Sequence, residues 1–418
     1  MTVPRQSDTH AAPPARAIYP AYATGLFGMG VMDVFVILVP LYALGLGMSA
    51  TQIGILVGVR GVLTMLFAIH AGTLMDRFGT RRVMLFFAGA TVVLAPVYPM
   101  VSWFPALVLL QMVCGGAASL CWLGAQTLVA HIGHGEASYL GRFSFAARVG
   151  TSIAPVVTGV IWDLGGAWFA FLFAMLWAAV LFAAILTVPE PNPAPARDPA
   201  AATADAAAGE PFRLRDALPR LSDYIRSSAM LAIPAVALTV AVVFVRNSTS
   251  GIQNSIYVVY MDEIGMTGTL IGILFSAVEV TSGLGSLLGG RAMRWMEPQW
   301  TLVIFTTLAI ALIAATPLLG GIFALLMLAQ IVRGALQGVI QPIMFSIQAK
   351  SVGRDQQGAV VGLRQTMNRI AAIIVPPLMG MIADMTSVAN SFLILGAVLL
   401  GACGLLALGA RRVPKFEE

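Results

Sequence analysis

The hexapeptides Thr51-Gln-Ile-Gly-Ile-Leu56 and Thr269-Leu-Ile-Gly-Ile-Leu274 lie 218 residues apart in a chain of 418 residues and differ at one position. The same offset also pairs Tyr42 with Tyr260, Gly47 with Gly265 and Met48 with Met266. An offset of 221 residues gives five further matches, which are Gly141 with Gly362, Arg148 with Arg369, Pro155 with Pro376, Gly159 with Gly380 and Asp163 with Asp384. This self-similarity predicts two related halves in tandem.

The composition of the chain restricts its environment. Hydrophobic residues make up 58% of the chain and charged residues 10%, whereas about a quarter of the residues in soluble domains are charged. The mean hydropathy is +0.87. Because this is too little charge to cover the surfaces of two or three soluble domains, a soluble enzyme is excluded and a membrane protein with many spans is expected.

Twelve apolar segments are long enough to cross a membrane as helices, which takes about 20 residues each. They do not alternate as the strands of a barrel do, and a helix pairs its own backbone groups in lipid. We therefore predict an all-α membrane protein with 12 transmembrane helices in two pseudo-symmetric six-helix bundles. The expected spans are 18–45, 50–73, 83–102, 104–131, 141–164, 166–187, 229–260, 267–292, 299–319, 321–348, 358–385 and 388–410.

Basic residues are distributed unevenly around these spans. The loops after the odd-numbered spans contain no Lys or Arg, and the basic residues outside the spans lie in the termini, in the even-numbered loops or at helix ends beside them. Both termini are therefore expected in the cytoplasm, as in a multi-pass protein of a cell inner membrane. The same distribution explains the net charge of +5 without a nucleic-acid partner.

The predicted parts of the chain are two bundles, two tails and a linker. They are a cytoplasmic N-terminal tail (1–17), an N-terminal bundle (18–187), a cytoplasmic linker (188–228), a C-terminal bundle (229–410) and a cytoplasmic tail (411–418). Segment 212–226 of the linker is predicted to form an amphipathic helix on the membrane surface, with a solvated linker as the alternative. Two bundles joined in this way can rock against each other, which is the geometry of alternating access.

The loop between the second and third spans contains the most specific motif. It reads Gly72-Thr-Leu-Met-Asp76-Arg77-Phe-Gly79-Thr-Arg81-Arg82, which closely resembles the signature loop of the major facilitator superfamily. With the twelve spans and the repeat, the resemblance covers nearly the whole chain. It implies secondary transport through a central cavity, and it implies that Asp76, Arg77 and Arg81 latch the cytoplasmic gate. The alternative is a basic loop that only sets orientation.

The fifth span carries a second motif, Gly150-Thr-Ser-Ile-Ala-Pro155-Val-Val-Thr-Gly159. It partly resembles the antiporter motif of exporters in this family, although Ala154 and Thr158 replace two of its glycines. The proline and the remaining glycines can bend the helix and let it pack closely. The resemblance implies export in exchange for protons, and the replaced glycines leave the direction open.

Charged residues inside spans are costly unless they are paired or hydrated, so each is a candidate for function. Asp33 and Glu279 can exchange protons, which arginine cannot, and they are predicted to couple transport to protons. Structural ion pairs to arginine are the alternative. The five arginines within spans are Arg60, Arg148, Arg246, Arg333 and Arg369. Their excess over the two acids favours an anionic or carboxylate-bearing substrate, and a symmetric structural role is an alternative for Arg148 and Arg369.

Further polar residues are expected to line the cavity. The candidates for substrate binding are Arg60, Arg246, Gln253, Asn254, Arg333, Gln337, Gln341 and Tyr42. The spacing of Arg333, Gln337 and Gln341 places them on one face of a helix. His131, His134 and Glu136 have metal-like spacing but lie at a solvated helix end, and no metal site is predicted.

These observations together predict a proton-coupled secondary transporter that works by alternating access and exports a small organic compound, anionic or amphipathic. It is expected to be a monomer in the lipid bilayer, to have the small-molecule substrate and protons as its partners, and to use the proton gradient rather than a cofactor. An enzyme is not predicted, because no catalytic grouping or nucleotide loop is present. The alternatives are proton-symport uptake of an organic anion and a non-transporting receptor with a transporter fold.

Overall fold

The computed structural model describes residues 14–67, 74–75, 78–134, 136–189, 229–353 and 357–412. Within these ranges all regular secondary structure is helical, which confirms the predicted all-α class. The predicted N-terminal tail up to residue 13, the linker from residue 190 to 228 and the C-terminal tail from residue 413 lie outside the described residues.

The first half contains six spans. The second span is broken at Arg60 and Gly61, and the fifth and sixth spans form one continuous helix except at Gly166, where φ is 65° and ψ is −161°. The elements of this half are α1 (Ala15–Gly45), α2 (Ala50–Val59), α3 (Val62–Phe67), α5 (Thr80–Leu94), the 3₁₀ helix η1 (Ala95–Met100), α6 (Phe104–Ile132) and α7 (Ala137–Thr187).

The second half repeats this plan. Its first span contains a π-helical turn, η3 (Gln253–Tyr257), between α10 (Pro234–Ile252) and α11 (Val258–Glu263). The other elements are the 3₁₀ turns η2 (Ala229–Ala232) and η4 (Thr316–Leu319), and the helices α12 (Gly268–Ser286), α13 (Gly289–Trp295), α14 (Pro298–Ala314), α15 (Phe323–Ser351), α16 (Gln357–Met385) and α17 (Val388–Ala410).

The number of spans agrees with the sequence. Nine described helices are long and apolar enough to cross a membrane, and the bent pair of α13 and α14 gives a tenth. Counting α7 as two spans on either side of Gly166, and counting the shorter helix Ala50–Leu66, gives the predicted twelve. The eighth span ends earlier than predicted, because α12 stops at Ser286 and α13 is separate from it.

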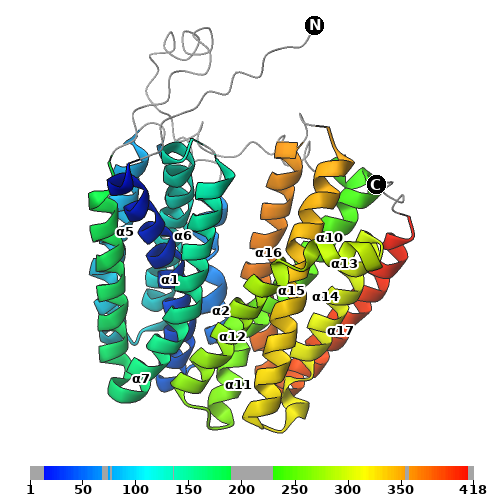
Figure 1. Ribbon diagram of the computed structural model, residues 1–418. Helices are drawn as coiled ribbons and strands as arrows, with labels where there is room; N and C mark the ends of the chain where they lie inside the picture. Colours follow the sequence, from blue (N-terminus) through cyan, green and yellow to red (C-terminus); the bar gives the residue numbers. More distant parts are fainter. Residues whose placement is uncertain are drawn as a thin grey trace, which may run out of the picture.

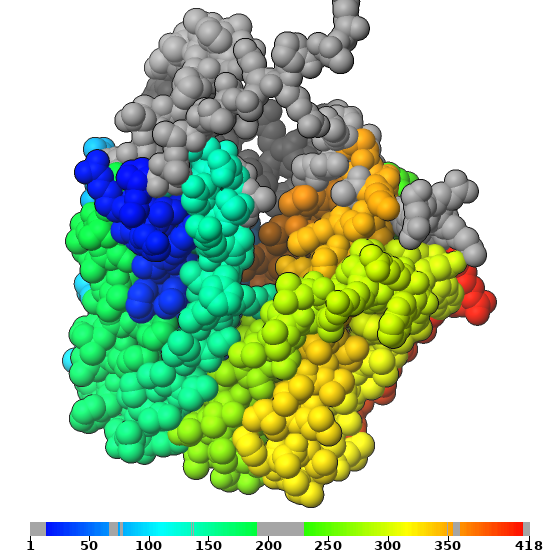
Figure 2. All heavy atoms as spheres, in the orientation of Figure 1, coloured from blue at the N-terminus to red at the C-terminus, as the bar shows by residue number. Residues whose placement is uncertain are grey.

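The two halves stand side by side. Figure 1 shows α1 to α7 on the left and α10 to α17 on the right, and the first turn of α1 and the last turn of α17 lie at the same end of the molecule. We call this the termini end and the opposite one the far end. In Figure 2 the first part of α7 and the orange ends of α15 and α16 stand apart at the termini end, whereas α7 and α12 are in contact toward the far end.

Small residues hold the halves in contact at the far end. A Cβ on Gly272 of α12 would lie 2.3 Å from the carbonyl oxygen of Pro155 on α7, and a Cβ on Gly54 of α2 would lie 2.3 Å from that of Pro376 on α16. Glycine permits such close helix packing, because no side chain separates the backbones. The two contacts occupy equivalent places in the repeat, so the halves meet at two pseudo-symmetric interfaces, α7 with α12 and α2 with α16.

The matched residues of the repeat also explain where these helices start. Gly47 and Gly265 have φ of 72° and 78°, a left-handed conformation that glycine adopts without strain. Two residues later, Ser49 accepts a hydrogen bond from the Gln52 amide at 3.3 Å and begins α2. Thr267 caps α12 in the same way. The turn and the cap therefore fix the N-termini of α2 and α12. Both N-termini donate hydrogen bonds to an aspartate of the other half, as described below.

Candidate functional site

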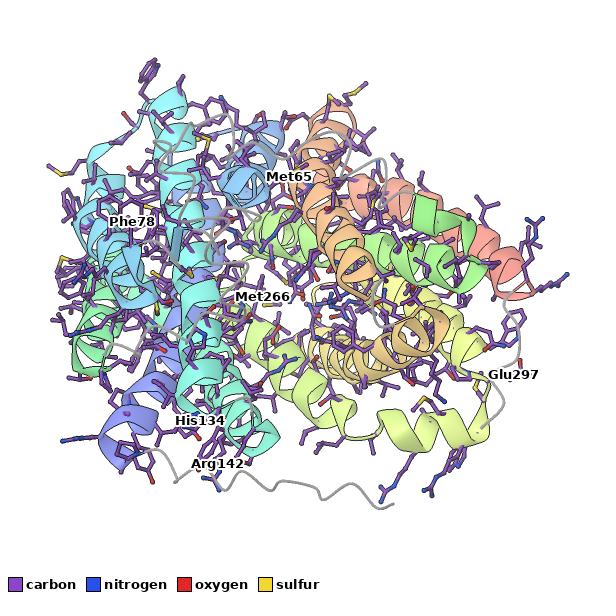
Figure 3. All side chains as sticks on the ribbon, turned by 90° about the horizontal axis from the view of Figure 1, so that it is seen from above. Met65, Phe78, His134, Arg142, Met266 and Glu297 are labelled. Carbon is purple, nitrogen blue, oxygen red and sulfur yellow. The ribbon has the colours of Figure 1, made fainter. Side chains whose placement is uncertain are left out.

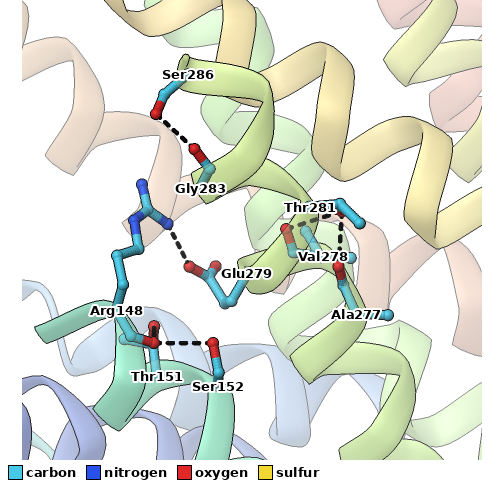
Figure 4. Close-up of polar contacts among 9 residues, drawn as sticks. All are labelled: Arg148, Thr151, Ser152, Ala277, Val278, Glu279, Thr281, Gly283 and Ser286. Carbon is cyan, nitrogen blue, oxygen red and sulfur yellow. Dashed lines mark hydrogen bonds and ion pairs between the residues drawn. The ribbon is translucent and has the colours of Figure 1, made fainter. Parts of the chain in front are cut away.

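An ion pair joins the two halves near the middle of the α7–α12 interface. Arg148 Nη1 on α7 lies 2.7 Å from Glu279 Oε2 on α12 (Figure 4). The two side chains are 39% and 35% exposed, so the pair is neither fully desolvated nor free in water. A short, charge-assisted bond of this kind stabilises the contact of the halves while Glu279 is ionised.

Asp33 lies beside this pair, on α1. Its carboxylate interacts electrostatically with Glu279, Arg60 and Arg148. Its Oδ2 atom is buried and has no hydrogen-bond partner among the described residues. The structure therefore brings the two predicted proton-exchanging residues together with two arginines, at the boundary of the halves.

Arg60 is placed by the break in the second span. It follows the last residue of α2, and its Nη1 donates to the carbonyl oxygen of Met32 on α1 at 3.4 Å. A Cβ on Gly115 of α6 would lie 2.1 Å from Arg60 Cγ. Gly115 therefore lets α6 pack directly against Arg60, which fixes the position of this guanidinium between α1 and α6.

A pocket of about 170 Å³ opens next to Arg60, between the halves. Its polar lining combines two guanidiniums, three amides and two hydroxyls, from both halves of the chain. These side chains are Arg60, Ser119, Asn247, Ser250, Asn254, Asn368 and Arg369. The lining contains no carboxylate among the described residues, so the pocket presents positive charge and hydrogen-bonding groups. We call it the Arg60–Arg369 pocket.

Six of the eight predicted binding residues fall into two groups. Arg60 and Asn254 line the Arg60–Arg369 pocket, and Arg246 interacts electrostatically with Arg148 and Glu279. The pocket also contains residues that were not predicted to bind substrate, notably Arg369, Asn368, Ser119 and Ser250. Asn368 and Arg369 are adjacent polar residues within a predicted span, and this pattern could have indicated from the sequence that they line a polar pocket.

The other group lies inside the second half. Arg333 is 1% exposed, and its Nε donates to Gln330 Oε1 at 2.9 Å. It also donates to Gln253 Oε1, and Gln337 donates to the Thr249 hydroxyl at 3.1 Å. These contacts join α15 to α10 and η3 and place the side chains outside the Arg60–Arg369 pocket.

Two further candidates for substrate binding lie elsewhere. Tyr42 is 9% exposed, packs edge-on against Phe171, and donates to the carbonyl oxygen of Val101 at 3.1 Å. It therefore belongs to the core of the first half. Gln341 is half-buried on α15 and does not line the Arg60–Arg369 pocket.

The predicted gating loop is described only in part. Gly72, Asp76 and Arg77 lie outside the described residues. Gly79 has φ of 86° and precedes α5, and Arg82 is exposed on that helix. Arg81 donates to the carbonyl oxygens of Ile185 and Leu186 at 3.2 and 2.6 Å. Arg81 thus caps the end of α7 within its own half.

The antiporter-like motif packs α7 against two neighbours. A Cβ on Gly150 would lie 2.0 Å from the carbonyl oxygen of Leu26 on α1, and one on Gly159 would lie 2.0 Å from that of Gly268 on α12. Together with the Pro155 contact, the motif forms much of the α7–α12 interface.

Two aspartates close the far end of both interfaces. Asp163 of α7 accepts hydrogen bonds from the backbone amides of Gly268 and Thr269, at 2.7 and 2.8 Å, at the start of α12. Asp384 of α16 accepts from the amides of Ala50 and Thr51, both at 2.9 Å, at the start of α2. Helix N-termini favour a negative charge, because their first amides are unpaired. The repeat had paired these aspartates, but their contact with the other half was not predicted.

Figure 3 views the molecule from the termini end. His134 lies on the first half and Glu297 at the outer edge of the second. No group of three metal-binding side chains is found in the described part of the chain.

Comparisons with known proteins agree with this architecture. The family model described as Major Facilitator Superfamily matches residues 21–248 and 238–418. A search of curated protein sequences finds no significant match. The chain is similar to the crystal structure of a point mutant of the nucleoside transporter NupG, with a TM-score of 0.75, 14% identity, and coverage of 95% of this chain and 100% of that one.

Two other solved structures have the same fold. One is a POT family transporter in complex with 5-aminolevulinic acid, with a TM-score of 0.72, 13% identity, and coverage of 95% of this chain and 96% of that one. The other is a bacterial homolog of the human lysosomal transporter Spinster in an inward-facing, unoccupied conformation, with a TM-score of 0.68, 16% identity, and coverage of 96% of each chain.

Proposed function

The chain belongs to the Major Facilitator Superfamily of membrane transporters, and from this premise we propose that it is a proton-coupled secondary transporter that exports a small organic compound by alternating access. The observation that carries this proposal is the Arg148–Glu279 ion pair at 2.7 Å, which joins the halves and has a second carboxylate, Asp33, beside it. A proton-exchanging group at the moving boundary can link protonation to motion.

The conformation supports alternating access. The halves are locked at the far end by Asp163 and Asp384. The basic residues outside the spans lie in the termini, in the even-numbered loops or at helix ends beside them, so the termini end is the cytoplasmic side by the positive-inside rule. In this proposal the described conformation is open to the cytoplasm, and the opposite conformation requires the far end to separate.

In this proposal the Arg148–Glu279 ion pair determines in which conformation Glu279 binds a proton and in which it releases it. Opening the far end separates α7 from α12, which would leave Arg148 and Glu279 apart in a partly nonpolar environment. Protonation of Glu279 removes its charge and lowers the cost of this separation. Glu279 therefore binds a proton in the outward-open state and releases it to the cytoplasm when the pair forms again.

One observation supports export, which is that the Gly150, Pro155 and Gly159 motif resembles that of exporters. The inward proton movement proposed above can exchange for outward movement of substrate. Solved structures of this fold include a nucleoside transporter and a POT family transporter bound to 5-aminolevulinic acid, so the fold accommodates different small organic substrates. We propose an anionic or amphipathic compound, because arginines outnumber acids at the boundary of the halves.

The test uses inside-out membrane vesicles, a panel of labelled organic anions and an imposed proton gradient. An exporter that exchanges with protons accumulates its substrate when the vesicle lumen is acid. Asp33→Asn and Glu279→Gln are expected to remove the dependence on the gradient, whereas Asp262→Asn, an exposed carboxylate at the far end, keeps it. If both substitutions leave the dependence intact, the assignment of the proton site is wrong. Accumulation driven by the reverse gradient would show uptake.

A further inference from the structure

The two pseudo-symmetric interfaces differ near their middle. Arg148 in the α7–α12 interface meets Glu279. The repeat equivalents are Arg369 and Gly61, and both line the Arg60–Arg369 pocket in the α2–α16 interface. The second interface therefore keeps the arginine and has a glycine where the first has the carboxylate.

Charge in this pocket is not balanced. Arg60 and Arg369 interact with like charge across it, and neither forms an ion pair with a carboxylate among the described residues. Asp33 is an electrostatic neighbour of Arg60, so it offsets one of the two guanidiniums. Among the described residues, one positive charge is therefore left without a compensating carboxylate in the middle of the spans, where a charge is costly without a partner.

The remaining groups suit a carboxylate. Asn247, Asn254 and Asn368 supply amide N–H donors, and Ser119 and Ser250 supply hydroxyls. Arginine binds carboxylates through a pair of parallel hydrogen bonds, and neutral donors around it satisfy the remaining lone pairs. The volume of about 170 Å³ admits a small polar group rather than a long apolar one.

We infer that the Arg60–Arg369 pocket binds the carboxylate of the transported compound, which takes in the α2–α16 interface the place that Glu279 takes in the α7–α12 interface. This inference rests on the proposed transport function and names the substrate class and the residues that recognise it. The bound carboxylate joins Arg60 of one half to Arg369 of the other. Substrate therefore contributes a charged contact between the halves at a place where the described side chains form no ion pair.

The test places a cysteine in the pocket and measures whether an anionic or a cationic thiol reagent reacts with it faster. Ser250→Cys places a thiol in the lining, while Cys114, Cys121 and Cys403 are buried and serve as the measured background. The purified protein is treated with an anionic and a cationic methanethiosulfonate reagent, and each rate is divided by its rate with 2-mercaptoethanol. The anionic reagent is expected to react on the order of tenfold faster, because a charged, partly enclosed site concentrates the opposite charge.

Substitutions of single arginines show whether the difference in rate between the two reagents comes from the pocket. Arg369→Gln and Arg60→Gln are each expected to reduce the ratio several-fold, whereas Arg411→Gln makes the same charge change on the exposed surface and leaves it unchanged. Sodium acetate, compared with sodium chloride at equal ionic strength, slows the anionic reagent, and acetamide does not.

Several results would overturn the inference. These are a ratio at or below one, a ratio insensitive to both pocket arginines, equal effects of acetate and acetamide, and failure of both reagents to react. The measurement needs no proton gradient. It can therefore fail while Asp33 and Glu279 prove essential for coupling, or succeed while they do not, so the two proposals are tested separately.

Discussion

Asp163 and Asp384 hold the two halves together at the far end, and replacing both with asparagine is expected to open it. Each carboxylate accepts two backbone N–H bonds of 2.7 to 2.9 Å from the first turn of a helix in the other half. Asp163 also accepts from the Thr269 hydroxyl at 2.6 Å. Asparagine has nearly the same shape, so it removes the charge and one acceptor oxygen without creating a cavity.

The magnitude follows from these bonds. A hydrogen bond to a charged group contributes roughly 1.5–3 kcal/mol, and the amide nitrogen of asparagine cannot accept from the second backbone N–H. The loss at each position is therefore about 2 kcal/mol, or about a 30-fold shift toward the separated far end. The sites are in different interfaces, so their effects should nearly add.

The separation can be measured by the distance between two spin labels at the far end. Trp103 and Leu318 are 70% and 71% exposed, and they lie in far-end connections of the first and second half. Asp163→Asn and Asp384→Asn are expected to increase the population with a long distance, and the double variant should increase it most. Asp262→Asn removes an exposed charge at the same end and is the matched control. An unchanged distance distribution in the double variant, or an equal change in the control, would refute the reasoning.

Two further substitutions test how the helices are packed. Gly272→Ala places a methyl group 2.3 Å from a facing carbonyl oxygen, so it should separate α7 from α12 and lengthen the same spin-label distance; Gly290→Ala meets open space and should not. Arg81→Gln removes the 2.6 Å hydrogen bond to the Leu186 carbonyl and should lower the free energy of unfolding by about 1–2 kcal/mol. Thermal unfolding in detergent measures this loss, and the exposed Arg412→Gln should show none.

The sequence was sufficient for the fold because the fold depends on local patterns. Apolar length gives the spans, and the repeat gives two halves of six. The same repeat explains Gly47 and Gly265, whose positive φ values mark equivalent turns before α2 and α12. The predicted spans 141–164 and 166–187 meet where the structure has its break, at Gly166, although α7 continues as a helix on both sides of it.

The site depends on which side of a helix faces the other half, and hydropathy does not give this. Arg333 and Gln337 lie on one polar stripe, as predicted, but the stripe contacts α10 and η3 within the second half. In a bundle, a polar stripe can satisfy itself in the interior of one half or at the boundary of two. Arg369 differs in the opposite sense. A symmetric structural role was the alternative for Arg148 and Arg369, and the structure places Arg369 in the lining of the Arg60–Arg369 pocket.

The difference between the two interfaces has a mechanical consequence. At the far end, both have an aspartate on a helix N-terminus and a glycine against a proline carbonyl, so both resist separation there in similar ways. Near the middle of the interfaces, only the α7–α12 interface has a carboxylate that pairs with its arginine among the described residues. In the proposed mechanism, protonation of Glu279 acts on one interface, and the inferred anion between Arg60 and Arg369 acts on the other. If the halves move as bodies, as alternating access requires, a change at either interface alters the cost of the same motion, and this would link proton and substrate without direct contact between them.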